Sequence, residues 1–214
     1  MNSIETYTIV FGGKTGVGKS STQRVLWNLD WPSDDAVACT IYPQAAFISN
    51  TEFSYLLHDK VRVVDMPGVG ESIEADQVYL SYYREWLPKA NCLVWVTQAD
   101  TRAYKRDEMF LIELKPMLKK DLLLIVALNK IDYLGVDEHK QLFDRTRGVP
   151  SEDQLKQLND KINDVFAVFE EVIDGTIPFG RDQIVPYTAV YKWGLPHLVN
   201  MIFKKGENND RVDN

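Results

Sequence analysis

The chain has 214 residues, of which 45% are hydrophobic and 26% are charged, so we expect one soluble globular domain. Its formal net charge of −7 disfavours broad electrostatic binding to nucleic acid or anionic lipid. No apolar run approaches the ~20 residues that span a bilayer, and the N-terminus lacks a secretory signal pattern, so we expect a cytoplasmic protein without a membrane partner.

The first predicted elements are a strand, a glycine-rich loop and a helix. Residues Thr6 to Phe11 are β-branched or aromatic, which favours a buried strand, and Ser21 to Trp27 can continue as a helix. Between them, Gly13 to Ser20 (GKTGVGKS) matches the phosphate-binding pattern G-x-x-x-x-G-K-[ST] at each fixed position. A glycine-rich turn that binds nothing is the alternative, and the strand-loop-helix setting favours a phosphate site.

This loop supplies several candidate ligands for a nucleotide. Its backbone N–H groups can converge on one anion, and the following helix points its positive end at the same place. The Lys19 ammonium would reach the β- and γ-phosphates, and the Ser20 hydroxyl would bind Mg²⁺. We therefore expect the nucleotide to contact Gly13, Gly16, Val17, Gly18, Lys19, Ser20 and Ser21.

A loop at Ala36 to Pro43 follows a break at Asp30 to Asp35 and contains Thr40. A threonine about twenty residues beyond a P-loop lysine can place its hydroxyl on Mg²⁺ and its backbone N–H on the γ-phosphate, as in GTPase switch loops. An ordinary loop threonine is the alternative, so this assignment depends on the other motifs.

Three apolar runs then favour hairpin-paired strands at one edge of the sheet: Ala45 to Ser49, Phe53 to Leu57 and Val61 to Val64. The third run leads into Asp65-Met66-Pro67-Gly68, the D-x-x-G arrangement expected where a strand ends beside the γ-phosphate. Asp65 could hold Mg²⁺ through water, and the Gly68 N–H could meet the terminal phosphate. A simple Asp-x-Pro-Gly turn is the alternative.

Beyond this motif, Val69 to Ser72 predicts a mobile loop and Ile73 to Trp86 predicts a helix. Cys92 to Thr97 is a continuous apolar run typical of a central strand, and a helix is expected from about Lys105 to Met117. Arg102 lies between these two elements. A guanidinium there could approach a nucleotide across a dimer, and a solvated helix start is the alternative.

A second buried strand, Leu122 to Leu128, delivers Asn129-Lys130-Ile131-Asp132, the N-K-x-D pattern. Asp132 can accept hydrogen bonds from both the ring N–H and the amino group of guanine, whereas adenine has the opposite donor pattern. Lys130 would lay its stem over the base, and Asn129 would tie this loop to the P-loop. A charged turn is the alternative, which the position after the strand disfavours.

The remaining chain predicts a long amphipathic helix, a last strand and a last helix. Ser151 is the expected N-cap of the long helix, which carries apolar residues at helical spacing up to Val172 or Ile173. The last strand is expected at Ile184 to Tyr187, and Thr188-Ala189 after it would contact guanine through the Ala189 N–H. Gly194 opens the last helix.

These elements predict an α/β fold of the P-loop NTPase type, with three α/β/α layers and a mostly parallel sheet that has one antiparallel edge strand. We expect one GTP-binding domain at residues 1–203 and a polar, disordered tail at residues 204–214.

With these motifs in order, the sequence resembles the Era-like bacterial GTPases over almost its whole length. The strings Ala38-Cys39-Thr40, Asp65 to Ser72 and Ala99 to Ala103 are most similar to the short YfjP and YeeP type GTPases. The resemblance implies a GTP-binding fold and a hydrolase that uses Mg²⁺, with GTP and GDP as substrate and product.

Three departures from the Era pattern limit what the resemblance implies. Era-type loops that recruit K⁺ carry asparagine where this chain has Gly16, so potassium activation does not carry over. Ras-like enzymes have glutamine where this chain has Val69, so another group must orient the water, and Glu71 or Ser72 is a candidate. No C-terminal RNA-binding domain follows the GTPase motifs, so we expect no direct nucleic-acid domain.

The expected reaction is Mg²⁺-dependent hydrolysis of GTP by in-line attack of water, with Lys19, Thr40 and Gly68 clamping the phosphates. Turnover should be slow without a partner or a dimer. The alternative is a binding switch with negligible turnover that recruits a partner protein or a second copy in one nucleotide state. A P-loop ATPase or nucleotide kinase is disfavoured by the N-K-x-D pattern.

Overall fold

The computed structural model describes residues 6–31, 40–54, 56, 58–135 and 143–203. The expected tail at residues 204–214 and most of the expected loop before Thr40 lie outside these residues. Within the described part of the chain, no helix has the length and apolar content that crossing a bilayer requires.

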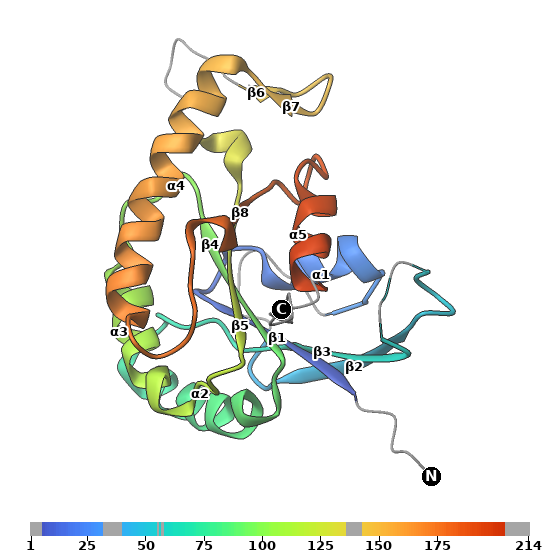
Figure 1. The fold of residues 1–214 in the computed structure, drawn as a ribbon, viewed down its shortest axis with the longest axis vertical. Coiled ribbons are helices and arrows are strands. Elements are labelled where there is room, and N and C mark those ends of the chain that lie inside the picture. Colours follow the sequence, from blue (N-terminus) through green and yellow to red (C-terminus); the bar gives the residue numbers. More distant parts are fainter. Residues whose placement is uncertain (1–5, 32–39, 55, 57, 136–142, 204–214) are drawn as a thin grey trace, which may run out of the picture.

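A six-stranded sheet forms the centre of the molecule, with the strand order β2-β3-β1-β4-β5-β8 (Figure 1). All neighbouring strands are parallel except β2 and β3, which pair antiparallel at one edge. The strands are β1 (Tyr7–Gly13), β2 (Gln44–Ser49), β3 (Lys60–Asp65), β4 (Cys92–Gln98), β5 (Leu123–Asn129) and β8 (Ile184–Pro186). The expected mostly parallel sheet with one antiparallel edge strand is therefore confirmed.

Five α-helices in the described residues cover the two faces of this sheet. They are α1 (Lys19–Trp27), α2 (Ile73–Trp86), α3 (Lys105–Leu114), α4 (Glu152–Ile173) and α5 (Leu195–Ile202). Helices α2, α3 and α4 lie on one face and α1 and α5 on the other, which gives the three layers (Figure 1). Short elements complete the described chain: η1 (Leu87–Lys89), η2 (Lys115–Met117), η3 (Ile131–Tyr133), η4 (Arg181–Gln183), β6 (Phe143–Asp144) and β7 (Val149–Pro150).

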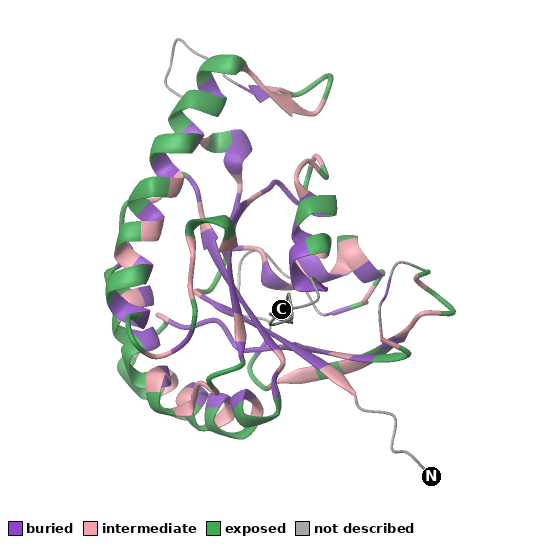
Figure 2. Ribbon diagram, viewed as in Figure 1, coloured by how far each residue is buried: buried purple, intermediate pink, exposed green. Residues whose placement is uncertain are grey.

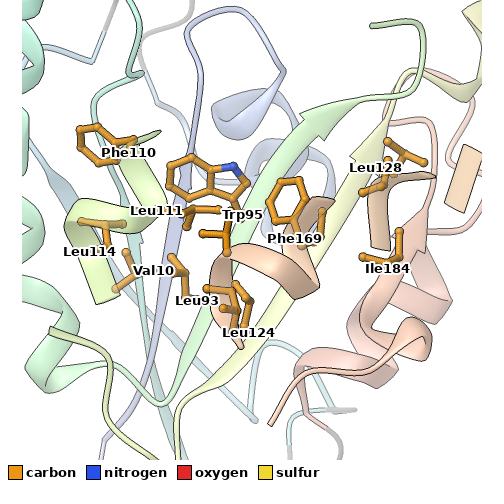
Figure 3. Packing of buried hydrophobic residues seen from close by; sticks show 14 of the residues in the cluster. Val10, Leu93, Trp95, Phe110, Leu111, Leu114, Leu124, Leu128, Phe169 and Ile184 are labelled. Carbon is orange, nitrogen blue, oxygen red and sulfur yellow. The ribbon is translucent and has the colours of Figure 1, made fainter. Parts of the chain in front are cut away.

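The central strands are buried on both faces because helices cover both sides of the sheet (Figure 2). Alternate residues of β1 point to opposite layers: Val10 packs with α2, α3 and α4, whereas Phe11 packs with α1 and α5. On the first face, the Trp95 ring lies 6.1 Å from the Phe110 ring of α3 (Figure 3). This double burial explains why β4 and β5 read as continuous apolar runs.

The prediction of a strand at Phe53 to Leu57 is wrong for the residues that the structure describes there. Phe53 and Leu56 lie in the connection between β2 and β3, where the Leu56 N–H donates to the Phe53 carbonyl at 3.0 Å. Leu56 is 6% exposed and belongs to the core cluster beneath α1 and α5. The apolar run therefore reflects a loop that packs against the core, and the edge hairpin consists of β2 and β3.

Candidate functional site

The glycine-rich loop lies between β1 and α1, as the motif predicts. Gly18 caps α1 with a φ of 95°, in the left-handed region that favours glycine. A Cβ at this position would lie 2.5 Å from the Asn129 side-chain nitrogen, so only glycine lets the two loops approach this closely. Ser21 lies half-buried in the first turn of α1.

Lys19 lies inside this loop and is 6% exposed. Its ammonium donates to the Gly13 carbonyl at 3.2 Å and to the Lys14 carbonyl at 2.9 Å. Burial lowers the pKa of Lys19 to about 8, and the nearby carboxylates of Asp65, Glu71 and Asp107 oppose that shift. The ammonium is thus held by weak acceptors, which a phosphate can replace.

Three oxygen-bearing side chains from separate parts of the chain meet at the end of β3. The Ser20 hydroxyl donates to Asp65 Oδ2 at 2.7 Å, and the Thr40 hydroxyl donates to the same oxygen at 3.1 Å. Gln23 donates to Asp65 Oδ1 at 2.5 Å. Burial raises the pKa of the fully buried Asp65, while Lys19 and these three hydrogen bonds oppose the increase. The structure therefore brings the three predicted metal ligands together.

The loop after β3 is joined to the glycine-rich loop by backbone hydrogen bonds. The Val69 N–H donates to the Gly13 carbonyl at 3.2 Å, and the Thr15 N–H donates to the Val69 carbonyl at 3.1 Å. Gly68 lies so close to this loop that a Cβ there would be 2.6 Å from Thr15 Cα. Val69 itself is 2% exposed and packs into the core.

The N-K-x-D loop after β5 contacts the glycine-rich loop from the other side. The Asn129 amide donates to the Val17 carbonyl at 2.9 Å, and the Lys130 ammonium donates to the Gly16 carbonyl at 2.9 Å. Asp132 is 4% exposed, and its Oδ1 has no hydrogen-bond partner among the described residues. A buried acceptor without a donor is costly, which fits a ligand that supplies one.

The loop after β8 completes this side of the site. The Ala189 N–H donates to Asn129 Oδ1 at 3.2 Å, and Thr188 is 1% exposed with a buried hydroxyl that no described residue pairs. The Ala189 N–H, which is expected to contact guanine, thus donates to Asn129 in this structure. Both residues lie beside the N-K-x-D loop, as expected.

Several contacts of the glycine-rich loop were missed by sequence reasoning. Lys14 forms an ion pair of 2.9 Å with Asp107 of α3 and donates to the Ala103 carbonyl at 2.8 Å. Gln98, the last residue of β4, donates to the Gly16 carbonyl at 3.1 Å. Lys14 fills a variable position of the motif, so no pattern in the sequence marks its partner. Arg102 is exposed in the loop before α3.

Residues 8–130, more than half of the chain, match the family described as 50S ribosome-binding GTPase. Two Escherichia coli K12 proteins, both described as uncharacterized, are similar over 51% of this chain: YkfA is 40% identical over 114 residues, and YfjP is 38% identical over 113. The matched segment covers 37% of the length of either relative.

The fold is similar to that of solved GTPase structures at low sequence identity. Era of Aquifex aeolicus, bound to GDP and AlF4⁻, superposes with a TM-score of 0.64 at 19% identity, over 94% of this chain and 56% of the Era chain. A mutant of Arabidopsis thaliana Toc33 described as dimerization-deficient gives 0.63 at 17% identity, over 94% and 84% of the two chains.

The family match, the two E. coli relatives and the three-layer fold agree with the motifs that meet at this site. The chain belongs to the 50S ribosome-binding GTPase family and is an Era-like bacterial P-loop GTPase related to YfjP.

Proposed function

We propose that this protein binds GTP, hydrolyses it to GDP and phosphate with Mg²⁺, and works as a nucleotide-dependent switch. The observation that carries the proposal is the hydrogen bond of 2.9 Å from the Asn129 side chain to the Val17 carbonyl. It joins the loop that would read the base to the loop that would hold the phosphates. One nucleotide can therefore contact both loops.

Guanine selection is supported by the buried carboxylate of Asp132. Its Oδ1 lacks a donor among the described residues, and guanine offers two adjacent donors on its Watson–Crick edge. Adenine would present an acceptor to this carboxylate, so hydrogen bonding between Asp132 and guanine should favour GTP over ATP by about 1–3 kcal/mol. Lys130, Thr188 and Ala189 would border the same base.

Magnesium binding is supported by the donor set at the end of β3. The hydroxyls of Ser20 and Thr40 both lie within hydrogen-bond distance of Asp65 Oδ2, and oxygen ligands are those that Mg²⁺ prefers. When bound, the ion would neutralise charge on the β- and γ-phosphates. Ionised Asp65 is required for this role, and a divalent cation would favour that form against the effect of burial.

Hydrolysis would depend on how the protein holds the terminal phosphate for attack by water. Lys19 would leave the carbonyls of Gly13 and Lys14 for the phosphates, and backbone N–H groups of Thr40 and Gly68 would hold the γ-phosphate. The Val69 side chain is buried in the core, so it takes no part in orienting the water. This supports slow turnover by the isolated protein.

A second candidate function is a binding module with negligible turnover, which recruits a partner protein or a second copy in its GTP state. The observation that favours it is the absence of a polar side chain at Val69, where Ras-like enzymes carry glutamine. The description of the Toc33 mutant as dimerization-deficient supports a homodimer as one form of this module.

Two measurements test the proposal. Calorimetry with GTP and ATP in the presence of Mg²⁺ should show binding of GTP at least about tenfold tighter than that of ATP. Single-turnover release of γ-phosphate should occur with Mg²⁺ and stop with a chelator. Equal affinity for ATP would reject the guanine assignment, and GTP binding without any phosphate release would favour the binding module.

A further inference from the structure

The carboxylate of Glu71 is held between the glycine-rich loop and α2. The Thr15 hydroxyl lies 2.9 Å from Glu71 Oε1 and 2.9 Å from the Gly68 carbonyl, so its single proton serves one or both acceptors. The Tyr79 hydroxyl of α2 donates to Glu71 Oε2 at 3.2 Å. Glu71 itself is exposed. The glycine-rich loop thus holds one oxygen of this carboxylate and α2 holds the other, while the side chain remains exposed to solvent.

The other residues of this loop are engaged elsewhere. Val69 is buried, and both its N–H and its carbonyl bond the glycine-rich loop. The Gly70 N–H donates to Asp76 at 2.7 Å. Ser72 is the N-cap of α2, where its hydroxyl accepts a hydrogen bond from the Ala75 N–H at 3.0 Å. Among residues 69–72, Glu71 alone presents a charged acceptor to the solvent beside Gly68.

We propose that Glu71 orients the water that attacks GTP, and that Thr15 and Tyr79 are the positioning residues that hold it there. This inference rests on the proposed hydrolysis. Glu71 accepts a hydrogen bond from the water while the new bond forms between the water oxygen and the γ-phosphorus. The bond to the β,γ-bridging oxygen breaks, GDP leaves with that electron pair, and the water proton passes to an oxygen of the phosphate product.

The charge of Glu71 has a consequence for binding that separates this role from a structural one. A carboxylate beside the γ-phosphate repels it, so removing the charge should leave GTP affinity unchanged or tighter. A residue that only held the loop together would weaken GTP binding when it is lost. The inference therefore predicts a lower rate of hydrolysis without weaker binding.

The test is single-turnover release of γ-phosphate from Mg²⁺-GTP by the full chain, with GTP affinity measured on the same proteins. Loss of one preorganised hydrogen-bonding group in an active site lowers the rate by about 10²–10³-fold, so Glu71→Ala should be at least about 100-fold slower. Glu71→Gln keeps a hydrogen-bond acceptor and should lie between Glu71→Ala and the wild type. Glu74→Ala, at an exposed carboxylate in the first turn of α2, is the matched control and should keep the wild-type rate.

The positioning role is tested by conservative variants. Thr15→Ala and Tyr79→Phe each remove one hydroxyl and should slow hydrolysis about tenfold, and Thr15→Ser should restore the rate because it keeps the hydroxyl. Wild-type turnover in Glu71→Ala, or weaker GTP binding by both Glu71 variants, would overturn this inference and leave the proposed hydrolysis intact. Binding of GTP without hydrolysis by the wild type would instead reject the proposed hydrolysis, and the inference with it.

Discussion

In the proposed function Asp132 selects the base, because it is a buried carboxylate with one oxygen that no described residue satisfies. Replacing it with asparagine exchanges an acceptor for a donor at one position. Asp132→Asn should weaken GTP binding by about 10- to 100-fold and strengthen binding of xanthosine triphosphate, whose base has a carbonyl in place of the amino group. Calorimetry with both nucleotides measures the exchange.

The matched control for this change is Asp121→Asn, at an exposed aspartate before β5. It makes the same chemical substitution outside the site and should leave both affinities unchanged. Unaltered GTP affinity in Asp132→Asn would show that this carboxylate does not read the base.

The lowered pKa of Lys19 predicts how the affinity for GTP depends on pH. Burial lowers the pKa of its ammonium to about 8 in the free protein, and a bound triphosphate favours the charged form and so raises that pKa. Above that pH the free protein must take up a proton to bind GTP, so affinity should fall by up to about tenfold per pH unit. Below it, Lys19 is already charged and this dependence disappears.

Calorimetry between about pH 7.5 and 9 in buffers of different ionisation enthalpy measures both the affinity and the proton uptake. Lys19→Arg is the control, since an arginine stays charged throughout this range. Ionisation of the guanine ring affects both proteins alike. If the wild type and Lys19→Arg had the same pH dependence, Lys19 would not be the group that takes up the proton.

Helix α3 is joined to the glycine-rich loop by the ion pair between Lys14 and Asp107. The Asp107 side chain is fully buried and also accepts a hydrogen bond from the Trp95 indole at 2.9 Å. Asp107→Ala removes the acceptor of the buried Trp95 indole N–H and the ion-pair partner of Lys14, whose side chain is 20% exposed, so the free energy of unfolding should fall by about 1–3 kcal/mol. Urea denaturation should show a lower midpoint with an unchanged slope.

A double variant separates the ion pair from simple loss of packing. Lys14→Met with Asp107→Ala removes both charges and should recover part of the loss, whereas Glu113→Ala on the exposed side of α3 should change stability by less than about 0.5 kcal/mol. A double variant no more stable than Asp107→Ala would show that the charge on Lys14 is not what makes the single change costly.

The elements with a strong local signal could be predicted from the sequence. Helix α2 occupies Ile73–Trp86 as expected, and α4 begins after Ser151, whose hydroxyl accepts from the Gln154 N–H at 3.2 Å. The Phe53 to Leu57 run was misassigned because a loop that packs on the core and an edge strand have the same apolar composition. The burial of Leu56 depends on tertiary packing, which the periodicity of the sequence does not reveal.

The contacts in the candidate site could likewise be predicted from the sequence only where a motif marks them. Motif positions fix which loops meet, and the hydrogen bond between Asn129 and Val17, which are 112 residues apart, follows from two motifs known to share one edge of a sheet. Thr15 and Lys14, in contrast, occupy variable positions of the motif. Their partners Glu71 and Asp107 lie 56 and 93 residues further along the chain. Nothing local to either residue predicts such a pair.

In the whole molecule, the proposed site is assembled from loops that follow β1, β3, β5 and β8, together with Thr40 before β2 (Figure 1). The unfolded chain does not hold these loops together, so a ligand that contacts several of them binds the folded state alone. Ligand binding and folding are then linked, and the stability of the protein reports occupancy of the site.

Guanine nucleotide should therefore raise the unfolding temperature. At a GTP concentration about 100-fold above the dissociation constant, linkage adds about 2.7 kcal/mol to the free energy of unfolding. For a chain of this size each kcal/mol shifts Tm by about 2–4 °C, so Mg²⁺-GTP should raise Tm by about 5–10 °C. Calorimetric melting with GTP, GDP and ATP at equal concentration measures the effect. ATP should raise Tm by no more than about 3–6 °C, because tenfold weaker binding at the same concentration adds only about 1.4 kcal/mol. An equal shift with ATP, or the same GTP shift in Asp132→Asn, would mean that the stabilisation comes from the phosphates alone and that the loops after β5 and β8 do not close on the base.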